Sequence, residues 1–223
     1  MKVHLIHQWD VSSKEAIALQ ISISKQISLR PIPKRITTVA GADVSYSRKG
    51  RELYAAALVF TFPDLVLLEM ETALGTIDFP YIPGLLSFRE GPVLLSALEK
   101  IQNRPDVIIF DGHGIAHPRR AGLASHLGMI LKCPTIGCAK TRFVGEHRAV
   151  PPQKGSIQPI KYQGQVVGAA VRTRERVKPV YVSPGYAVTL NASIDIVLAC
   201  CRKYRLPEPV RQAHIVANRL RLN

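Results

Sequence analysis

The spacing of apolar residues predicts an amphipathic helix near the start of the chain. Between residues 12 and 29, apolar side chains recur at intervals of three and four: Ala16, Leu19, Ile23 and Ile27. Ser12 or Ser13 is placed to cap the first turn, which also contains Glu15. Pro31 and Pro33 would end the helix, because the residue before a proline disfavours helical backbone.

Three runs rich in β-branched and apolar residues follow this helix: residues 36–47, 53–62 and 66–74. The connections at 48–51 and 62–64 are short enough for antiparallel hairpins. The pattern therefore predicts a three-stranded meander.

The rest of the chain alternates between helical and strand patterns. The expected elements are a helix over 85–102, a strand over 107–110, a helix near 121–131, a strand over 135–138, a hairpin or strand pair at 165–171 and 180–182, and helices over 192–204 and 209–222. A meander followed by this alternation is the element order of the ribonuclease H-like fold. We expect an α/β protein with one central mixed sheet flanked by helices, and one domain over residues 1–223.

The strand predicted at 107–110 ends in a carboxylate. Asp111 is followed at once by Gly112 and Gly114, which bracket His113. In an open α/β sheet, ligands bind beyond the carboxyl ends of the strands, so Asp111, His113 and His117 would open onto a site. The alternative is that Asp111 caps the next helix and the glycines only turn the chain.

Two further acids change this picture. Asp43 lies in an otherwise small or apolar strand, where burying a carboxylate costs several kcal/mol unless it is paired or holds a metal. A structural salt bridge is the alternative for Asp43, and Glu90 taken alone would be a surface residue. Together with Asp111 they give three carboxylates from separate elements, which are ligands suited to Mg²⁺. Two such ions bridging a phosphate would activate water and stabilise the leaving oxygen.

Two basic side chains are candidates beside these acids. His214 follows Arg211 by one turn on the predicted last helix and would reach back toward a metal, although a lone helical histidine is more often an ordinary residue. Lys140, after the strand at 135–138, would place a positive charge against a scissile phosphate. The lysine does not belong to a P-loop, because Pro134 and Ala139 stand where glycines are needed. A serine or cysteine hydrolase is not favoured either, because the sequence lacks a Gly-x-Ser-x-Gly nucleophile elbow.

Composition points to a polyanionic partner. Lys and Arg number 30 against 16 Asp and Glu, a net charge of +14 with a sequence pI near 10.0, and nucleic acid is the first expectation. The sequence has no apolar run approaching the roughly 18 residues of a membrane span, and its N-terminus is not a signal peptide. The four cysteines show no Cys-x-x-Cys pair, so we expect reduced thiols and a cytoplasmic protein.

Several motifs in register resemble the endonuclease V family, whose members are deoxyinosine-specific DNA repair nucleases. The resemblance covers nearly the whole chain and rests on residues 40–46 around Asp43, 80–90, 111–119, 122–128, 137–141 and 211–214. It implies a ribonuclease H-like fold, Mg²⁺ or Mn²⁺ as cofactor, and incision at the second phosphodiester bond 3′ to the lesion, leaving 3′-hydroxyl and 5′-phosphate ends.

By this resemblance Asp43, Glu90 and Asp111 are metal carboxylates, and His214 matches a final helix in which some relatives carry an acid. His117 and Lys140 fall at active-site positions that contact phosphate or position water. Tyr81 matches a strand-separating wedge, in a loop stiffened by its neighbours. The expected DNA- and base-binding residues are Tyr81, Pro80, Ile82, Pro83, Gly84, Leu85, Gly112 and Gly114. Glycines there would let backbone approach a flipped hypoxanthine.

Two alternatives remain open from the sequence. One is an endoribonuclease acting on inosine in RNA, and the other is a non-catalytic nucleic-acid binder on the same scaffold. Retained carboxylates argue against the binder, because acids facing phosphate do not help binding. The expected partner is DNA containing deoxyinosine, with inosine-containing RNA as the alternative, and the protein is expected to be a monomer.

Overall fold

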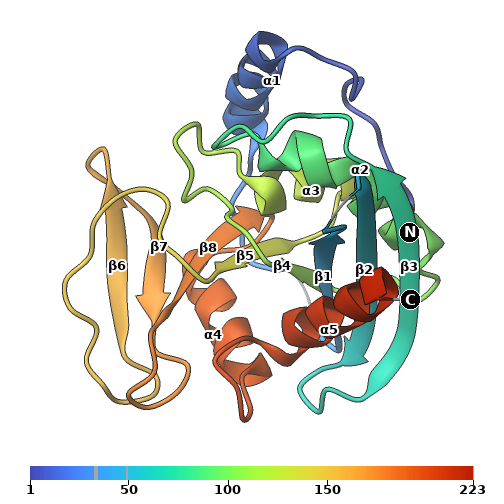
Figure 1. The fold of residues 1–223 in the computed structure, drawn as a ribbon. Helices are drawn as coiled ribbons and strands as arrows, with labels where there is room; N and C mark the ends of the chain where they lie inside the picture. The colour runs from blue at the N-terminus through green and yellow to red at the C-terminus, as the bar shows by residue number, and fades with distance from the viewer. Residues whose placement is uncertain (33–34, 49, 223) are drawn as a thin grey trace.

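One eight-stranded sheet runs through the chain. The computed structural model describes residues 1–32, 35–48 and 50–222. Over these residues the strands are β1 (Thr38–Tyr46), β2 (Glu52–Thr61), β3 (Leu67–Thr76), β4 (Val107–Phe110), β5 (Thr135–Ala139), β6 (Ile157–Tyr162), β7 (Gln165–Val171) and β8 (Val180–Tyr186). The helices are α1 (Ser13–Gln26), α2 (Leu86–Lys100), α3 (Leu123–Leu131), α4 (Leu190–Cys200) and α5 (Glu208–Leu222) (Figure 1).

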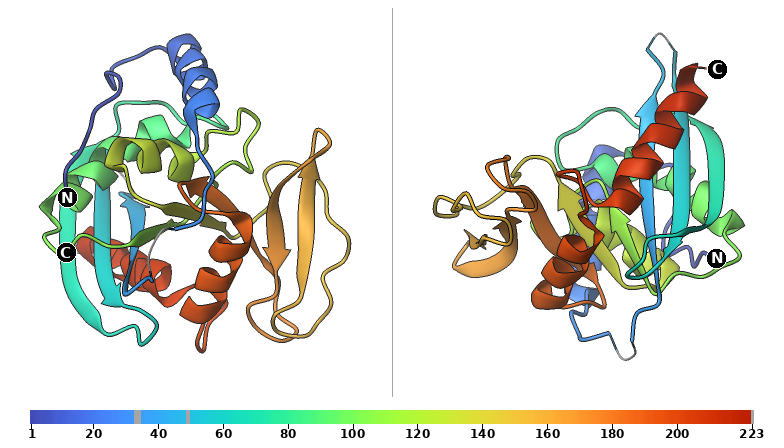
Figure 2. Two further views of the ribbon diagram at one scale, coloured as in Figure 1. Left: turned by 180° about the vertical axis from the view of Figure 1, so that it is seen from behind. Right: turned by 90° about the horizontal axis from the view of Figure 1, so that it is seen from below.

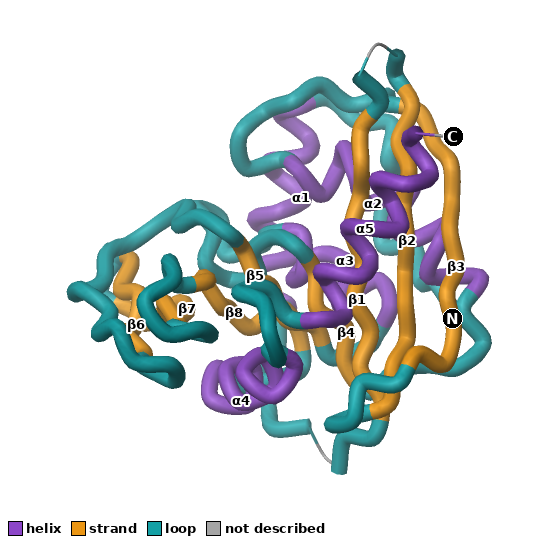
Figure 3. Tube along the Cα trace, turned by 60° about the horizontal axis from the view of Figure 1, so that its bottom comes forward, coloured by secondary structure: helices purple, strands orange, loops and turns teal. Residues whose placement is uncertain are grey.

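The strand order is β3-β2-β1-β4-β5-β8-β7-β6. β1, β2 and β3 form the expected antiparallel meander, and β4 and β5 continue it in parallel with β1. β8, β7 and β6 complete the sheet with antiparallel pairings, so β3 and β6 are its two edges (Figure 3). This arrangement confirms the ribonuclease H-like, mixed-sheet class.

Helices cover both faces of the sheet. α2 and α3 pack on one face, with α1 beyond them, and α4 and α5 pack on the other (Figures 1 and 2). Because side chains alternate along a strand, Ala40, Ala42 and Val44 of β1 join the core under α2 and α3. Gly41 and Asp43 therefore face α5. No helix in the described ranges is long and apolar enough to cross a membrane.

Close packing of α5 on β1 depends on Gly41. A Cβ atom at this position would lie 2.1 Å from the backbone carbon of Pro209, in the first turn of α5. The missing side chain lets the helix axis approach the sheet, and it places the face of α5 that carries His214 against β1.

The start of α1 is the capping box expected from the sequence. Glu15 donates its backbone N–H to the Ser12 hydroxyl at 3.3 Å, and its carboxylate accepts from the Ser12 N–H at 2.8 Å. The helix ends at Gln26, three residues before the predicted limit at residue 29, because Ile27 is already extended. Pro31 comes after this end, and Pro33 lies outside the described residues, as does residue 49 in the first hairpin connection.

Two predicted boundaries in the C-terminal third were wrong. The strand predicted to end at 182 continues to Tyr186, and the helix predicted over 192–204 spans Leu190–Cys200. Thr189 caps α4 through its hydroxyl, and Cys201 leaves the helix because it adopts extended backbone. The sequence analysis also missed β6. This edge strand contains Pro159 and buries only Ile160, so it shows no alternation of apolar and polar residues.

Candidate active site

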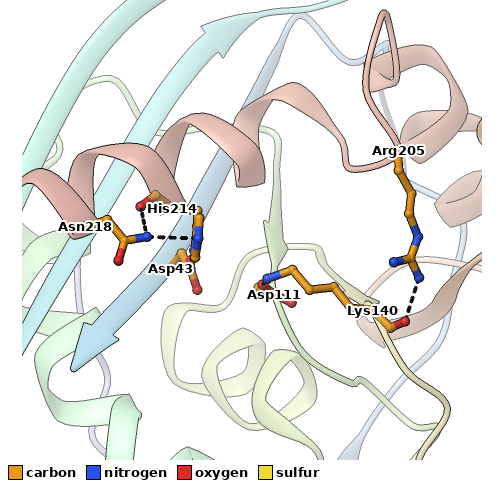
Figure 4. A network of polar contacts seen from close by, with 6 residues as sticks. All are labelled: Asp43, Asp111, Lys140, Arg205, His214 and Asn218. Carbon is orange, nitrogen blue, oxygen red and sulfur yellow. Dashed lines mark hydrogen bonds and ion pairs between the residues drawn. The ribbon is translucent and has the colours of Figure 1, made fainter. Parts of the chain in front are cut away.

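Strand alternation brings three of the predicted site residues to one face of the sheet. Asp43 lies within β1, Asp111 comes directly after β4, and Lys140 comes directly after β5. Each follows, at a spacing of two, a residue that faces α4 and α5: Gly41, Ile109 and Cys138. The side chains of Asp43, Asp111, Lys140 and His214 gather beside the carboxyl ends of β4 and β5 (Figure 4). These positions were predicted from the sequence, and the fold brings them together.

His214 projects from α5 onto Asp43. Its Nδ1 lies 2.6 Å from an Asp43 carboxylate oxygen, and this hydrogen bond raises the pKa of the imidazole against the opposing effect of burial. Asn218 donates to the other ring nitrogen at 2.9 Å and to the His214 carbonyl at 3.0 Å (Figure 4). Ser45 in turn donates to the Asn218 side-chain oxygen at 2.9 Å. The imidazole is therefore fixed in orientation from both sides.

Lys140 forms an ion pair with Asp111 through its Nζ. The main chain at Lys140 is itself held, because Arg205 donates to the Lys140 carbonyl at 2.6 Å (Figure 4). Arg205 also donates to the Pro179 carbonyl at 2.7 Å. Burial and the nearby Asp43 raise the pKa of Asp111, while Lys140 acts in the opposite direction. The alternative in which Asp111 caps the next helix does not hold, since α3 has Gly122 as its N-cap.

Glu90 is a buried member of this acidic group. It lies in the second turn of α2, is only 8% exposed, and accepts a hydrogen bond of 2.6 Å from the Tyr46 hydroxyl. Burial, and then the charges of Asp43 and Asp111, raise its pKa to about 8, and the Tyr46 hydrogen bond partly offsets this. Glu90 is thus not the surface residue that its local sequence suggests.

A cavity of about 440 Å³ opens beside the acids, and Asp111 and its partner Lys140 belong to the cavity wall. Its wall includes Tyr81, Ile82, Pro83, Gly84 and Gly112 of the predicted base-binding set, together with His113 and His117. Tyr81 is 70% exposed at this wall. Three predicted members do not line the cavity: Pro80, Leu85 and Gly114.

Leu85 and Gly114 have packing roles instead. Leu85 is buried at the N-cap of α2, in an apolar cluster with Phe79 and Phe88. A Cβ at Gly114 would lie 2.1 Å from the carbonyl oxygen of Pro184 in β8, so this glycine allows the loop to approach the strand.

His117 belongs to the cavity wall and is only 3% exposed. Its Nε2 lies 2.9 Å from the Gly84 carbonyl oxygen and must carry the proton, while its Nδ1 accepts from the Arg119 N–H at 3.2 Å. Burial, followed by the charge of Arg119, lowers its pKa to about 4. Both ring nitrogens thus form hydrogen bonds to other groups of the protein, and these bonds fix the imidazole in the cavity wall.

Comparison with known proteins shows which family the chain belongs to. The endonuclease V family model matches residues 21–215. An endonuclease V from Methanothrix thermoacetophila is 49% identical over 217 residues, which cover 97% of this chain and 96% of the relative. The chain belongs to the endonuclease V family.

Solved structures of the family superpose along the chain. The endonuclease V of Streptomyces avermitilis is 40% identical with a TM-score of 0.91, over 99% of this chain and 97% of that one. The Ciona intestinalis endonuclease V, in complex with a DNA containing an inosine followed by a ribo-adenosine, is 27% identical with a TM-score of 0.82, over 93% of this chain and 96% of that one.

Several site residues of this family member were missed by sequence reasoning. Phe143 lines the cavity, is 40% exposed, and lies with its ring 5.7 Å from that of His113 and 5.5 Å from that of His117. Tyr46 and Gln20 were missed as well. An aromatic residue directly after Lys140, Thr141 and Arg142 was the only signal for Phe143, and neither Tyr46 nor Gln20 stands out in its own segment.

The donor chemistry of the acids fits a hard divalent cation. Among the described residues, no three His, Cys, Asp or Glu side chains already form a cage for a metal ion. Three carboxylates nevertheless come from separate elements, and burial with mutual repulsion raises the pKa of both Glu90 and Asp111. Added positive charge would relieve that repulsion. Mg²⁺ needs only one or two protein carboxylates, since waters and substrate phosphates complete its shell.

A second cavity, of about 850 Å³, lies at the β6 edge of the sheet, and its lining includes none of Asp43, Glu90, Asp111, Lys140 and His214. It is lined by Arg148, Lys161 and neighbouring polar residues. Glu146 and His147 also line this cavity, but none of the three grouped carboxylates does, so the chemistry is assigned to the smaller cavity beside Asp111.

Proposed function

We propose that this chain recognises deoxyinosine in DNA and hydrolyses the second phosphodiester bond 3′ to it, leaving 3′-hydroxyl and 5′-phosphate ends. One observation carries the proposal: the acidic group and the cavity meet at Asp111 and Lys140. A base held in the cavity would leave its own strand running past the carboxylates. A nearby bond in that strand, and not the base itself, is then the target.

Asp43, Glu90 and Asp111 would hold Mg²⁺, for which Mn²⁺ would substitute. When bound, the metal would supply an activated water and charge stabilisation at the leaving oxygen. His214 fixes the Asp43 carboxylate through its Nδ1, and Tyr46 fixes that of Glu90. Lys140 places an ammonium group beside Asp111, where it can also contact a phosphate oxygen.

The cavity would receive the base after it leaves the stack. Gly84 and Gly112 belong to its wall, and Tyr81 stands exposed at the rim, where its ring would fill the gap left in the DNA duplex. We assign His117 and Phe143 to the walls of this pocket.

Inosine in RNA is the second candidate substrate. The Ciona intestinalis relative was solved with a DNA whose inosine is followed by a ribo-adenosine, so a 2′-hydroxyl next to the lesion is compatible with that relative's site. We further propose a cytoplasmic, monomeric, single-domain enzyme. In support of the cytoplasm, all four cysteines are free thiols.

The test is cleavage of end-labelled strands that carry one inosine in DNA or in RNA, with adenine in the matched controls. In Mg²⁺ the expected product from inosine DNA is a single cut at the second bond on the 3′ side. A cut elsewhere would refute the assigned position. Cleavage of the RNA strand alone would make inosine RNA the substrate.

A further inference from the structure

The carbonyl oxygen of Gly84 accepts hydrogen bonds from three side chains. Gln20 Nε2 donates to it at 2.8 Å, and His117 Nε2 and Arg119 Nη2 each donate at 2.9 Å. A carbonyl oxygen has two lone pairs, so three donors leave it no capacity for a ligand. Gly84 closes the loop that carries Tyr81, and its carbonyl is therefore an anchor for that loop and not a group that reads the base.

Gln20 ties this anchor to a second segment. The side chain is 1% exposed, and its Nε2 also donates to the Ala121 carbonyl at 3.0 Å. Its Oε1 accepts from Arg119 Nε at 2.6 Å. The amide orientation is fixed, because two carbonyls require the NH₂ group and a guanidinium requires the oxygen. One glutamine thus joins the loop before α2 to the loop between β4 and α3.

Gly84 is suited to this arrangement in two ways. Its φ of +85° lies in the left-handed region that favours glycine. A Cβ atom there would also lie 2.7 Å from Arg119 Nη2 and 3.3 Å from His117 Nε2. The position must remain free of a side chain for the three donors to reach the carbonyl.

We propose that Gln20 is a positioning residue for base recognition, which locks the Tyr81 loop and the 111–121 loop into the geometry that accepts inosine. The inference rests on the function proposed above and adds a role for α1, which carries none of the three carboxylates proposed to hold the metal. Gln20 lines the cavity, but the hydrogen bonds of its side chain go to Gly84, Arg119 and Ala121, so it acts on the base by positioning these groups. Its loss should therefore weaken discrimination between bases, while the carboxylates keep their positions.

The experiment compares Gln20→Met and Gln20→Glu with wild type, using metal-free binding to single strands that contain one inosine or one adenine. Methionine removes every hydrogen bond at similar volume, whereas glutamate keeps an acceptor for Arg119 but faces two carbonyl oxygens. We expect the ratio of the two affinities to fall about tenfold or more in both variants, since a binding site discriminates only while its supporting side chains hold it in place. Gln26→Met, at an exposed glutamine of the same helix, is the matched control.

Two further readouts separate positioning from a merely structural role. With 2-aminopurine placed next to the inosine in a duplex, the fluorescence gain on base flipping should fall in both Gln20 variants. On the single strand, where no unstacking is needed, the single-turnover rate constant at saturating protein should fall less than the affinity ratio does, since the carboxylates proposed to hold the metal keep their positions. Retained discrimination in a folded Gln20→Glu protein, or loss of rate with discrimination intact, would overturn the inference. Failure of wild type itself to prefer inosine would instead refute the proposed function.

Discussion

Individual acids at this site owe their properties to particular neighbours. Glu90 is held by one phenol, Asp111 by one ammonium group and Asp43 by one imidazole. Each carboxylate thus has its own partner, and the three partners come from β1, the end of β5 and α5. Substitutions that keep shape but remove a charge or a hydroxyl therefore test one contact at a time.

Asp111→Asn removes a charge while keeping the size of the side chain. Because the amide is a poor ligand for Mg²⁺, cleavage of inosine DNA should fall by more than about 100-fold. Binding of the same DNA should stay within about tenfold, since pocket and backbone contacts remain. Rate constants and affinities measured on the same preparation decide this. Asp195→Asn, at an exposed acid of α4, should change neither, and joint loss of folding and binding at Asp111 would make this acid structural.

Tyr46→Phe removes only the hydroxyl that bonds Glu90. The Glu90 carboxylate loses its orientation and the one hydrogen bond that lowers its pKa. We expect the Mg²⁺ concentration at half-maximal rate to rise about tenfold, the usual size of an effect on a metal ligand's own partner. A Mg²⁺ titration measures this shift, with Tyr54→Phe on β2 as the control. An unchanged titration would show that the phenol does not position Glu90.

Whole elements also explain what the sequence could and could not predict. Asp43, Asp111 and Lys140 were predictable because each sits on or directly after a strand with a clear apolar pattern. The contacts of Tyr46 with Glu90 and of Gln20 with Gly84 join residues 44 and 64 positions apart, and no local pattern encodes such pairs. β6 escaped because an edge strand exposed on most of its length has no alternation to detect.

The loop before α2 carries Tyr81, whose exposed ring is proposed to act on duplex DNA. Tyr81→Ala should impair cleavage of inosine in a duplex more than in a single strand, because unstacking costs a few kcal/mol only where there is a stack. The ratio of duplex to single-strand rate constants is the measurement, and the single strand is the internal control. Equal losses on both substrates would assign the ring to base stacking or catalysis, and no loss would leave it a structural residue.

The N-terminal segment meets α2 and α3 through a chain of histidines. His7 Nδ1 bonds the Gln8 carbonyl at 2.6 Å and so carries the proton, which leaves its Nε2 to accept from His126 Nε2 at 2.6 Å. His126 Nδ1 must then accept from the Ser87 hydroxyl at 2.9 Å. The three hydrogen bonds are therefore donated in one direction, from Ser87 of α2 to His126 of α3 and on to His7 of the N-terminal segment.

His126 links this packing to pH. Burial, followed by the neighbouring His7, lowers its pKa from 6.5 to about 3. The unfolded chain takes up this proton below pH 6.5, whereas the folded chain does not until about pH 3, so acid destabilises the fold across that window. The contribution to the free energy of unfolding is about 1.4 kcal/mol per pH unit. His126→Asn should lose this slope in denaturant titrations between about pH 6 and pH 4. His147→Asn is the control, and an identical slope in His126→Asn would contradict the assignment.

At the scale of the whole molecule, charge is the dominant feature. A net charge of +14 gives a field that attracts any polyanion, independent of sequence or lesion. Affinity for undamaged duplex should therefore fall steeply with salt, with a log-log slope of about −0.9 for each phosphate neutralised. Titrations at several salt concentrations measure this slope. A flat response would mean that the charge serves something other than the DNA backbone.

Gly41 has no functional group, yet it governs the distance between a helix and an acid. An alanine there would meet the backbone of Pro209, and α5 would have to move outward with His214, five residues further along. In a random screen for inactive variants, Gly41→Ala should therefore be found together with substitutions of Asp43 and His214, although it only adds a methyl group beneath α5. The His214 imidazole reaches the Asp43 carboxylate because one α-carbon of β1 carries no side chain.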